Sequence, residues 1–497
     1  MGNKYIVGID EGSQSAKITI FDLEGNIVCE GKEDLKPNHL AEPGIVEHPG
    51  DNLWEALGIA CKKAMTNFKE DPKDIIGIGV GVIRCCRVLM KADGTLAAPV
   101  ISWMDERVSR PYENTNPEVA YVTSLSGYIS SRLTGELKDN VANYFGQWPV
   151  DYNTWQWSKD EEVIKQYNIP REMLFDVQMP GTILGYITKD AFEMTGLPVG
   201  IPVVSTTSDK AVEGLGAGLI HDNSAVVSLG TYITCMVTGK ELPKDPQAFW
   251  AIMSSIPEKF LYEGYGVRRG MWTVSWFRDL MGSGLVERAK AQGMSPEELL
   301  NKEAEERVPV GSDGLMTILD WLANPWEPYK RGIMIGFGAH MDEAFMYRSI
   351  LEGIAYTVRN NCIAMCDELG KPLKEVIISG GGSNSDLFMQ IFADIFNLPA
   401  KRNVVNGSAS VGAAINTAVA VGAYADYEEA VGKMVKVKDT FYPIEKNVVL
   451  YERLNKEVYQ NISKYTDEVL KKTHAILNMD KEQKPTITSW SQAAKEE

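Results

Sequence analysis

Residues 5–31, which read YIVGIDEGSQSAKITIFDLEGNIVCEG, decide the fold that we expect for this chain. Runs rich in β-branched residues alternate with turn signals, and this alternation predicts an antiparallel meander of strands at 5–9, 16–21 and 27–30. The first strand ends on Asp10, and Gly12, Ser13 and Gln14 follow almost at once. A turn of this kind exposes backbone N–H groups that suit phosphate oxygens, and a carboxylate at the strand end suits Mg²⁺.

The same pattern returns in the second half of the chain. Residues 224–239 (SAVVSLGTYITCMVTG) again predict a strand, a Gly-Thr turn and a strand. Residues 375–396 (EVIISGGGSNSDLFMQIFADIF) predict a strand, a glycine loop and an amphipathic helix. The repeat favours two related α/β domains that face each other. We expect the boundaries to divide the chain into 1–217, 218–479 and a polar tail over 480–497.

The segments between these repeats contribute further elements. Asp51 and Asn52 are expected to cap a helix, and the β-branched run 75–83 is expected to form a strand. From the loop around Trp103 to a short strand at 202–204 the sequence is polar and predicts helix. The Gly/Ala-rich run 410–423 (SVGAAINTAVAVGA) predicts a helix packed closely against a partner helix.

Length and composition limit the classes of protein that the chain can be. At 497 residues it exceeds what one hydrophobic core usually organises, which agrees with two domains. The formal charge of −17 argues against nucleic acid as a partner, since nucleic acid is bound chiefly through cationic patches. It does not argue against a small anion, because backbone N–H groups and a divalent cation can hold phosphate.

The targeting and redox features of the sequence predict a cytoplasmic protein with no membrane partner. No apolar run is long enough to cross a bilayer, and the N-terminus has no cationic segment followed by an apolar core and a cleavage site. The seven cysteines are odd in number and scattered, and no pair has the matching Cys or His pair of a zinc site. They are expected to be reduced thiols.

Several motifs carry chemistry, and each also has a plain structural explanation. Gly230-Thr231 offers a second phosphate cradle, and Gly380-Gly381-Gly382 allows close approach of a flat ligand to the backbone. Asp209 follows a strand and a hydroxyl-rich turn, so it is either a helix N-cap or a catalytic base. Glycine turns also join strands in proteins of every class. It is the order and spacing of these motifs together that favours function.

The combination of motifs resembles the FGGY family of carbohydrate kinases. The resemblance covers nearly the whole chain and rests on GIDEGSQSAK (8–17), ISWMDER (101–107), TSDKAVEGLGAG (207–218), SLGTYIT (228–234) and ISGGGSNSDLFMQ (378–390). It implies the α/β fold of the actin, Hsp70 and hexokinase superfamily, in which two duplicated ribonuclease-H-like domains enclose a catalytic cleft. It also implies ATP and Mg²⁺ as cofactors and a small sugar or polyol as the acceptor.

The resemblance implies a role for each matching residue. Asp10 would lie at the metal and Asp209 would be the general base. The ATP-binding residues would be Gly12, Ser13, Gln14, Lys17, Gly230, Thr231, Gly381, Gly382 and Ser385. The substrate-binding residues would be Arg84, Cys85, Trp103, Asp105 and Lys210.

Departures from the family pattern leave the acceptor open. Lys210 stands where relatives commonly carry Gln, so it would lower the pKa of Asp209, meet an anionic or carbonyl-bearing substrate, or point to solvent. Cys85 replaces a residue that often sets specificity. We therefore expect ATP-dependent phosphorylation of a pentulose, a linear sugar or an autoinducer-2-like compound, with xylulose as the second choice. The alternative is a catalytically silent sugar and nucleotide sensor of the same fold, and a homodimer is one option for assembly.

Overall fold

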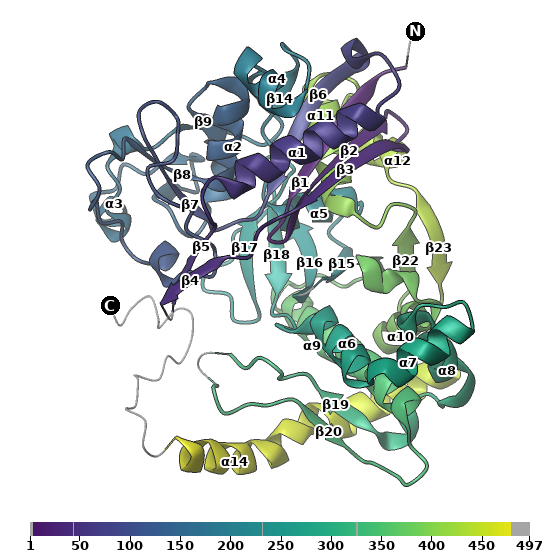
Figure 1. Ribbon diagram of the computed structural model, residues 1–497. Helices are drawn as coiled ribbons and strands as arrows, with labels where there is room; N and C mark the ends of the chain where they lie inside the picture. Colours follow the sequence, from purple (N-terminus) through teal and green to yellow (C-terminus); the bar gives the residue numbers. More distant parts are fainter. Residues whose placement is uncertain (1–2, 43, 231, 325–326, 479–497) are drawn as a thin grey trace.

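The computed structural model describes residues 3–42, 44–230, 232–324 and 327–478. Two large sheets organise the chain, one of six strands in the N-terminal half and one of seven strands in the C-terminal half (Figure 1). The predicted α/β class is therefore confirmed.

The first sheet has the strand order β13-β14-β6-β1-β2-β3. Its strands are β1 (Tyr5–Glu11), β2 (Ser15–Asp22), β3 (Ile27–Asp34), β6 (Ile75–Val82), β13 (Ile183–Tyr186) and β14 (Pro202–Val204). β1, β2 and β3 pair antiparallel, which confirms the predicted meander. On its other side β1 pairs parallel with β6, and β6 pairs parallel with β14. The carboxyl ends of β1, β6 and β14 therefore meet at one edge.

The second sheet repeats this arrangement with the order β17-β18-β16-β15-β21-β22-β23. Its strands are β15 (Ser224–Leu229), β16 (Ile233–Gly239), β17 (Phe249–Met253), β18 (Phe260–Gly264), β21 (Glu375–Ser379), β22 (Ala400–Asn403) and β23 (Val437–Phe441). β15 forms an antiparallel hairpin with β16 and pairs parallel with β21, as β1 does with β2 and β6. The predicted duplication of the hairpin is confirmed.

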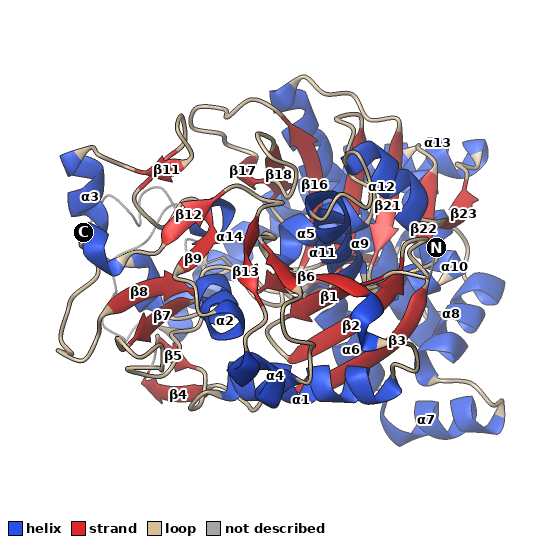
Figure 2. Ribbon diagram, turned by 90° about the horizontal axis from the view of Figure 1, so that it is seen from above, coloured by secondary structure: helices blue, strands red, loops and turns tan. Residues whose placement is uncertain are grey.

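Helices cover both faces of the first sheet. α1 (Asn52–Asn67) contacts β2 and β3, whereas α11 (Ser408–Ala420) packs on β1 and β6 from the opposite side (Figure 2). α5 (Asp209–Gly216) lies against α11, and the two backbones touch because glycines stand at the crossing. A Cβ on Gly216 would lie 1.8 Å from the carbonyl oxygen of Ser408, and a Cβ on Gly412 would lie 1.8 Å from that of Val212. The predicted close helix pair is confirmed.

The remaining helices flank the second sheet and the connecting segments. α9 (Glu343–Leu369) contacts β16 and β18 and buries apolar side chains against them. The others are α2 (Leu125–Thr134), α3 (Glu161–Tyr167), α4 (Lys189–Thr195), α6 (Gly270–Leu280), α7 (Gly282–Ala291), α8 (Pro296–Arg307), α10 (Asp386–Phe396), α12 (Tyr427–Met434), α13 (Glu445–Arg453) and α14 (Gln460–Leu477). No helix in the described part of the chain is both long and apolar enough to cross a membrane.

Two predictions about the first half were wrong in detail. α1 begins at Asn52 as expected, but the Asp51 carboxylate does not cap it, because it accepts hydrogen bonds from Tyr128 Oη (2.6 Å) and Arg132 Nη1 (3.1 Å). The segment expected to be helical before β14 also contains short strands that form two-stranded sheets or join the first sheet. Besides β13, they are β8 (Tyr121–Ser124), β9 (Lys138–Asn140), β10 (Val150–Asp151), β11 (Gln156–Trp157) and β12 (Asp176–Gln178). β8 pairs with β7 (Arg87–Met90), which precedes that segment.

The last two small sheets complete the strand inventory of the described residues. They are formed by β4 (His39–Glu42) with β5 (Ile45–Glu47), and by β19 (Met316–Ile318) with β20 (Ile333–Ile335). All seven cysteines are free, as the sequence predicted. The predicted tail over 480–497 lies outside the described residues.

Candidate active site

Three charged residues predicted from separate motifs meet at the carboxyl edge of the first sheet. Asp10 lies on β1 opposite Gly81 of β6, and Arg84 follows the end of β6. Asp209 opens α5, directly after a bridge between Val82 and Ser208. Because ligands of parallel α/β sheets bind outside the carboxyl ends of the strands, this edge is where a substrate is expected.

The carboxylate of Asp10 is held by no side chain among the described residues. It is half-buried and has no hydrogen bond or ion pair with any described residue. Burial raises its pKa to about 7, and the negative charges of Asp209 and Glu213 act in the same direction, while Lys17 and Lys210 oppose them. Three carboxylates are therefore gathered within electrostatic reach of one another.

Asp209 has a carboxyl group with a raised pKa at this edge. Burial raises the pKa of its carboxyl group, while the charges of Lys210 and Arg84 partly offset this effect. Its Oδ1 accepts a hydrogen bond from the backbone N–H of Lys210 at 2.9 Å. A carboxylate whose pKa lies above the ordinary value binds a proton more strongly, which favours proton abstraction from a hydroxyl group.

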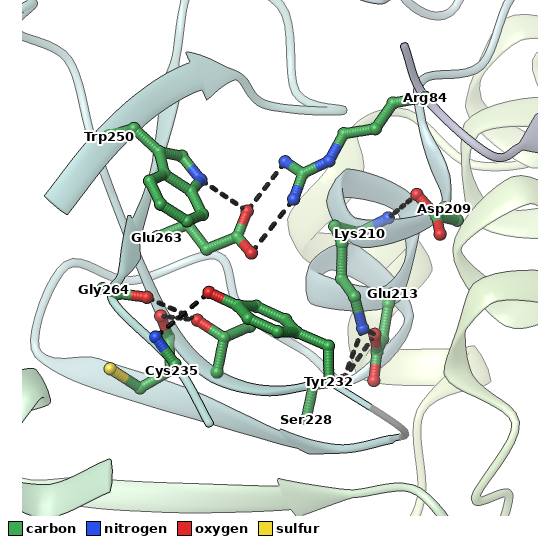
Figure 3. Close-up of polar contacts among 12 residues, drawn as sticks. Arg84, Asp209, Lys210, Glu213, Ser228, Tyr232, Cys235, Trp250, Glu263 and Gly264 are labelled. Atoms are coloured by element: carbon green, nitrogen blue, oxygen red, sulfur yellow. Dashed lines mark hydrogen bonds and ion pairs between the residues drawn. The ribbon is translucent and has the colours of Figure 1, made fainter. Parts of the chain in front are cut away.

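Lys210 and Glu213 connect α5 to the second sheet (Figure 3). Lys210 Nζ donates to Glu213 Oε2 at 2.8 Å and to Ser228 Oγ at 2.7 Å. Glu213 also accepts from Ser228 Oγ at 2.9 Å and from Ser379 Oγ at 3.0 Å, and these serines lie on β15 and β21. The Lys210 ammonium is therefore partnered within the protein and does not point freely into solvent.

A buried ion pair crosses between the two halves beside Asp209. Arg84 reaches Glu263 on β18 through two contacts, Nη1 to Oε2 at 2.7 Å and Nη2 to Oε1 at 3.1 Å (Figure 3). Trp250 Nε1 donates to the same carboxylate at 2.9 Å, and Glu263 is 0% exposed. Burial opposes ionisation of Glu263, but the charge and hydrogen bonds of Arg84 and Trp250 hold its pKa below the usual value.

The predicted phosphate turn of the first hairpin is open to solvent. The N–H of Gly12 donates to the carbonyl of Ser15 at 3.1 Å, which closes the turn, and the side chains of Ser13 and Gln14 are exposed. Lys17 lies on β2, and its Nζ forms an ion pair with Glu30 Oε1 at 2.7 Å. The turn therefore offers exposed polar groups next to Asp10, whereas Lys17 is already partnered.

The predicted nucleotide loops follow the paired strands β15 and β21. Gly380 has φ of 93°, and a Cβ there would lie 2.6 Å from the carbonyl oxygen of Leu229, so this loop lies against the Gly230 turn. Gly381 is exposed with open space around its Cα, whereas Gly382 is buried. Thr231 lies outside the described residues.

Ser385 has a structural role that the sequence did not predict. Its hydroxyl accepts from the N–H of Phe388 at 3.2 Å, which caps α10, and donates to Asn301 Oδ1 of α8 at 2.7 Å. The cap fixes the start of α10 directly after the glycine loop.

The remaining predicted substrate residues lie in different surroundings. Cys85 has φ of 66° and lies within electrostatic reach of Asp209 and Glu263, and Trp103 is 49% exposed. Asp105 is not brought together with them. Its buried carboxylate accepts from the N–H of Val46 at 2.6 Å and from Arg107 Nε and Nη2 at 2.9 and 2.7 Å. We therefore leave Asp105 out of the candidate site.

Sequence reasoning missed two carboxylates that complete the site. Glu213 lies one helical turn after Asp209, and Glu263 lies in the otherwise uncharged strand FLYEG. A lone acid in a buried strand is a usable indication of function, because its burial is costly unless it is paired. The identity of its partner, Arg84, depends on how the two halves meet.

The residues at this edge fit a divalent cation bound together with a nucleotide. Among the described residues no group of three or more His, Cys, Asp or Glu side chains could hold a metal ion alone. Mg²⁺ in nucleotide sites takes one or two carboxylates, with phosphate oxygens and waters completing its shell. Asp10 supplies an unpartnered carboxylate, and the neighbouring negative charges of Asp209 and Glu213 favour a cation there.

Comparisons with known proteins agree with this geometry. The N-terminal domain model of the FGGY family of carbohydrate kinases matches residues 5–123 and 110–216, and the C-terminal domain model of that family matches residues 225–421. The chain is 61% identical over 493 residues to the uncharacterized sugar kinase YgcE of Escherichia coli strain K12, covering 99% of this chain and 100% of that protein.

More distant proteins share the same architecture. A glycerol kinase of Thermococcus gammatolerans is 26% identical over 482 residues, covering 88% of this chain and 94% of the relative. The crystal structure of xylulose kinase from Rhodospirillum rubrum superposes with a TM-score of 0.80 at 20% identity, covering 94% of this chain and 100% of that one. The second similarity concerns the fold alone.

Proposed function

The chain belongs to the FGGY family of carbohydrate kinases, and from this premise we propose that it transfers the terminal phosphoryl group of Mg·ATP to a hydroxyl of a small polyhydroxylated compound. Asp209 is the proposed general base, and Asp10 is the proposed metal ligand. The observation that carries the proposal is the position of these two acids at one sheet edge, within electrostatic reach of each other.

In the proposed reaction the acceptor hydroxyl oxygen forms a bond to the γ-phosphorus while the bond from that phosphorus to the β,γ-bridging oxygen breaks. The hydroxyl proton passes to the Asp209 carboxylate, and ADP leaves. General-base catalysis of this kind contributes about 10²- to 10⁴-fold in rate. Mg²⁺, when bound with the nucleotide, supplies neutralisation of charge on the phosphoryl oxygens.

The two halves would divide the binding of ATP between them. The exposed turn Gly12-Ser13-Gln14 and the Gly230-Thr231 turn would hold the phosphates, and the open space at Gly381 would admit the nucleoside. In the same loop Gly382 is buried, and Ser385 fixes the start of α10 through its cap and its bond to Asn301. Lys17 contributes positive charge near Asp10. Positioning of the two reactants in this way removes much of the entropic part of the barrier.

The acceptor would lie beside Arg84 and Glu263. Arg84 and Cys85 lie within electrostatic reach of Asp209, the Glu263 carboxylate holds the Arg84 guanidinium in place, and the exposed Trp103 would add an aromatic face. A carboxylate accepts hydrogen bonds from sugar hydroxyl groups, and a guanidinium donates hydrogen bonds to an anionic or carbonyl group. We therefore propose a pentulose, a linear sugar or a related polyol as substrate. Lys210 would act on it through Asp209, since its Nζ is held by Glu213 and Ser228.

Several broader predictions accompany this function. We propose that the chain divides into domains over 1–217 and 218–479, and that it works in the cytoplasm without a nucleic-acid or membrane partner. The formal charge of −17 supports the exclusion of nucleic acid. A homodimer remains one option for assembly.

The proposal is tested by ADP release from the purified protein with Mg·ATP and a panel of polyols, ketoses, sugar acids and linear diketone-derived compounds. We expect acceptor-dependent ADP release that is lost in Asp209→Asn and kept in Asp222→Asn, an exposed acid paired with Lys371 that serves as the matched control. Binding of an acceptor without ADP release across the panel would support the silent sensor instead. ADP release that needs no acceptor would support an ATPase.

A further inference from the structure

A second cavity of about 300 Å³ lies in the C-terminal half, away from Asp10 and Asp209. It is enclosed by the loop between β18 and α6, the residues after β19, the middle of α9 and the start of α14 (Figure 1 shows these elements in the lower half). Its volume is within the range of small-molecule sites. Its polar lining residues include Arg268, Asp320, Lys330, Asn360, Asn361 and Gln460.

Arg268 brings an unneutralised cation to this cavity. Its half-buried guanidinium donates through Nη1 to the carbonyl oxygen of Ala323, and no acid among the described residues forms an ion pair with it. Burial lowers its pKa, which agrees with the lack of a nearby counter-charge. A guanidinium in this state has donors available for a carboxylate or phosphate group.

Asp320 brings a carboxylate to the same cavity, within electrostatic reach of Lys330. It is half-buried, and its side chain forms no hydrogen bond or ion pair with any described residue. Lys330, the other cation of the lining, forms its ion pair with Glu327 at 3.0 Å. Arg268 and Asp320 therefore face one cavity as opposite charges that are not paired with each other. Buried charges of this kind are costly unless a ligand or water satisfies them.

The amide side chains around these charges are oriented by the protein. Asn361 Nδ2 donates to the carbonyl oxygen of Tyr265 at 2.6 Å, and Gln460 Nε2 donates to Asn360 Oδ1 at 3.1 Å. These bonds use the amide N–H groups, while the side-chain oxygens of Asn361 and Gln460 accept nothing from the described residues. The cavity thus combines one cationic fork with several free acceptors. That set matches a molecule with one anionic group and several hydroxyl groups.

We propose that this cavity is a second binding site, which takes a small polyhydroxylated anion such as a sugar acid or a sugar phosphate. Arg268 binds the carboxylate or phosphate, and Asp320, Asn361 and Gln460 accept hydrogen bonds from the hydroxyl groups. The site goes beyond the proposed kinase activity, since none of its lining residues belongs to the candidate active site.

Residues that line the cavity are hydrogen-bonded to the residues that follow the Gly230-Thr231 turn. Val267 and Ile233 exchange backbone hydrogen bonds of 2.8 and 3.1 Å, and the N–H of Gly266 donates to Tyr232 Oη at 3.0 Å. Gly266, Val267 and Arg268 line the cavity, while Tyr232 and Ile233 follow directly on the Gly230-Thr231 turn. A ligand on Arg268 would therefore act on this turn, a consequence that rests on the proposed function, in which the turn holds ATP phosphates. Such coupling is reciprocal, so bound ATP changes the affinity of the second site by the same factor.

The test is isothermal titration of the full chain, without Mg·ATP so that no turnover occurs, with gluconate, glucose 6-phosphate and the neutral polyol sorbitol. We expect saturable binding of at least one anion, weakened about tenfold or more in Arg268→Gln and in Asp320→Asn. Arg331→Gln is the matched control and keeps the wild-type affinity, since Arg331 is an exposed arginine of the loop between β19 and β20 whose hydrogen bonds to described residues go to the carbonyls of Pro328 and Lys330. The ratio of the Kd values for gluconate and glucose 6-phosphate shows whether the site prefers a carboxylate or a phosphate. The neutral polyol sorbitol is expected to bind at least about tenfold more weakly than the preferred anion.

Two outcomes overturn the proposal. One is the absence of saturable binding by either anion, and the other is equal binding in wild type, Arg268→Gln and Asp320→Asn, which would assign the anion to the active site. Thermal unfolding of each variant checks that it is folded. If Arg268→Gln does not fold, the anion affinity of Asp320→Asn decides the outcome. The anion must also change the Kd of Mg·ATP in the wild type and not in Arg268→Gln. Kinase activity is measured separately, so failure of this site leaves that test intact.

Discussion

The carboxyl edge of the first sheet carries charged residues and that of the second sheet carries glycines, although the strands of the two sheets are arranged alike. In the first half the edge ends on charged groups, Asp10, Arg84 and Asp209. In the second half the equivalent strands β15 and β21 run into Gly230 and Gly380. Charges can act on a reacting hydroxyl and a metal, whereas glycines allow a nucleotide to approach the backbone closely.

The difference shows that one strand arrangement is used twice with different residues at its carboxyl edge. Glu263 is the informative exception, since it is a charged group of the second half. It is buried against Arg84 of the first half and has no charged neighbour of its own sheet within bonding distance among the described residues. The halves therefore meet through a pair in which each supplies one charge.

The largest expected effect comes from removing the proposed base of the first half. Asp209→Asn keeps the shape of the side chain but cannot take the hydroxyl proton, so we expect kcat to fall about 10²- to 10⁴-fold with the Kd of ATP unchanged. Steady-state ADP release and a separate ATP titration measure the two quantities. A fall of less than about tenfold would show that the charged edge does not carry the base, and the comparison would fail.

A smaller effect is expected from the charge pair between the halves. Glu263→Gln leaves Arg84 facing a neutral amide at a fully buried position, and we expect kcat/KM for the acceptor to fall about 10- to 100-fold with the KM of ATP unchanged. The control is Glu305→Gln, an exposed glutamate of α8. If the KM of ATP rises instead, Glu263 belongs to the nucleotide half of the chemistry.

The glycine edge of the second half predicts two neighbouring variants with different outcomes. Gly381→Ala places a methyl group in open space where the nucleoside is expected, so the KM of ATP should rise a few-fold, by roughly 1 kcal/mol of lost binding, with the unfolding temperature unchanged. Gly380→Ala forces φ of 93° on alanine and a clash with the Leu229 carbonyl, so it should lower the free energy of unfolding by about 1–3 kcal/mol. Equal effects of both variants on ATP would argue that the loop has no specific role.

The last expected effect concerns the stability of the fold and separates the ends of β1 and β15. β1 ends on Glu11, which is 0% exposed and whose carboxyl oxygens have no hydrogen-bond partner in the described part of the chain, whereas β15 ends on Leu229. Burial, with the charges of Asp51 and Asp10, raises the pKa of Glu11 well above its ordinary value. As pH rises above about 4, the unfolded chain releases this proton and the folded chain keeps it, so stability is lost at about 1.4 kcal/mol per pH unit until the folded pKa is passed.

Glu11→Gln removes this dependence. Chemical denaturation should give nearly equal free energies of unfolding for wild type and variant at acid pH, and a more stable variant at pH 8. Glu305→Gln, which is exposed, should follow the wild type at every pH. An unchanged pH dependence in Glu11→Gln would show that this carboxyl group ionises normally in the folded protein.

Local patterns in the sequence predicted the hairpins, the glycine loops and the two acids Asp10 and Asp209. These features depend on strand alternation and turn chemistry, which neighbouring residues determine. Glu263 was missed because its meaning depends on Arg84, which lies 179 residues away in the chain. No periodicity within one segment contains that information.

Two predictions about side chains show the same limit. Asp51 was expected to cap α1, but Tyr128 and Arg132 of α2 take its carboxylate. Asp105 matches a motif that the family resemblance linked to the sugar pocket, yet Arg107 and the backbone of Val46 use its oxygens. A short carboxylate takes the charged partner within its reach, whether that partner is distant in the chain, as Arg132 is from Asp51, or near, as Arg107 is to Asp105, because a hydrogen bond to a charged group contributes more than one to a neutral group.

The proposed function requires that one groove join the acids of the first half to the nucleotide of the second. A crystal structure of Asp209→Asn with Mg·ATP and the acceptor found in the panel tests it most directly. We predict phosphates between the Gly12-Ser13-Gln14 turn and the Gly230-Thr231 turn, the metal beside Asp10, and residue 209 within hydrogen-bond distance of an acceptor hydroxyl. A nucleotide bound away from Asp10, or an acceptor out of reach of residue 209, would contradict the account.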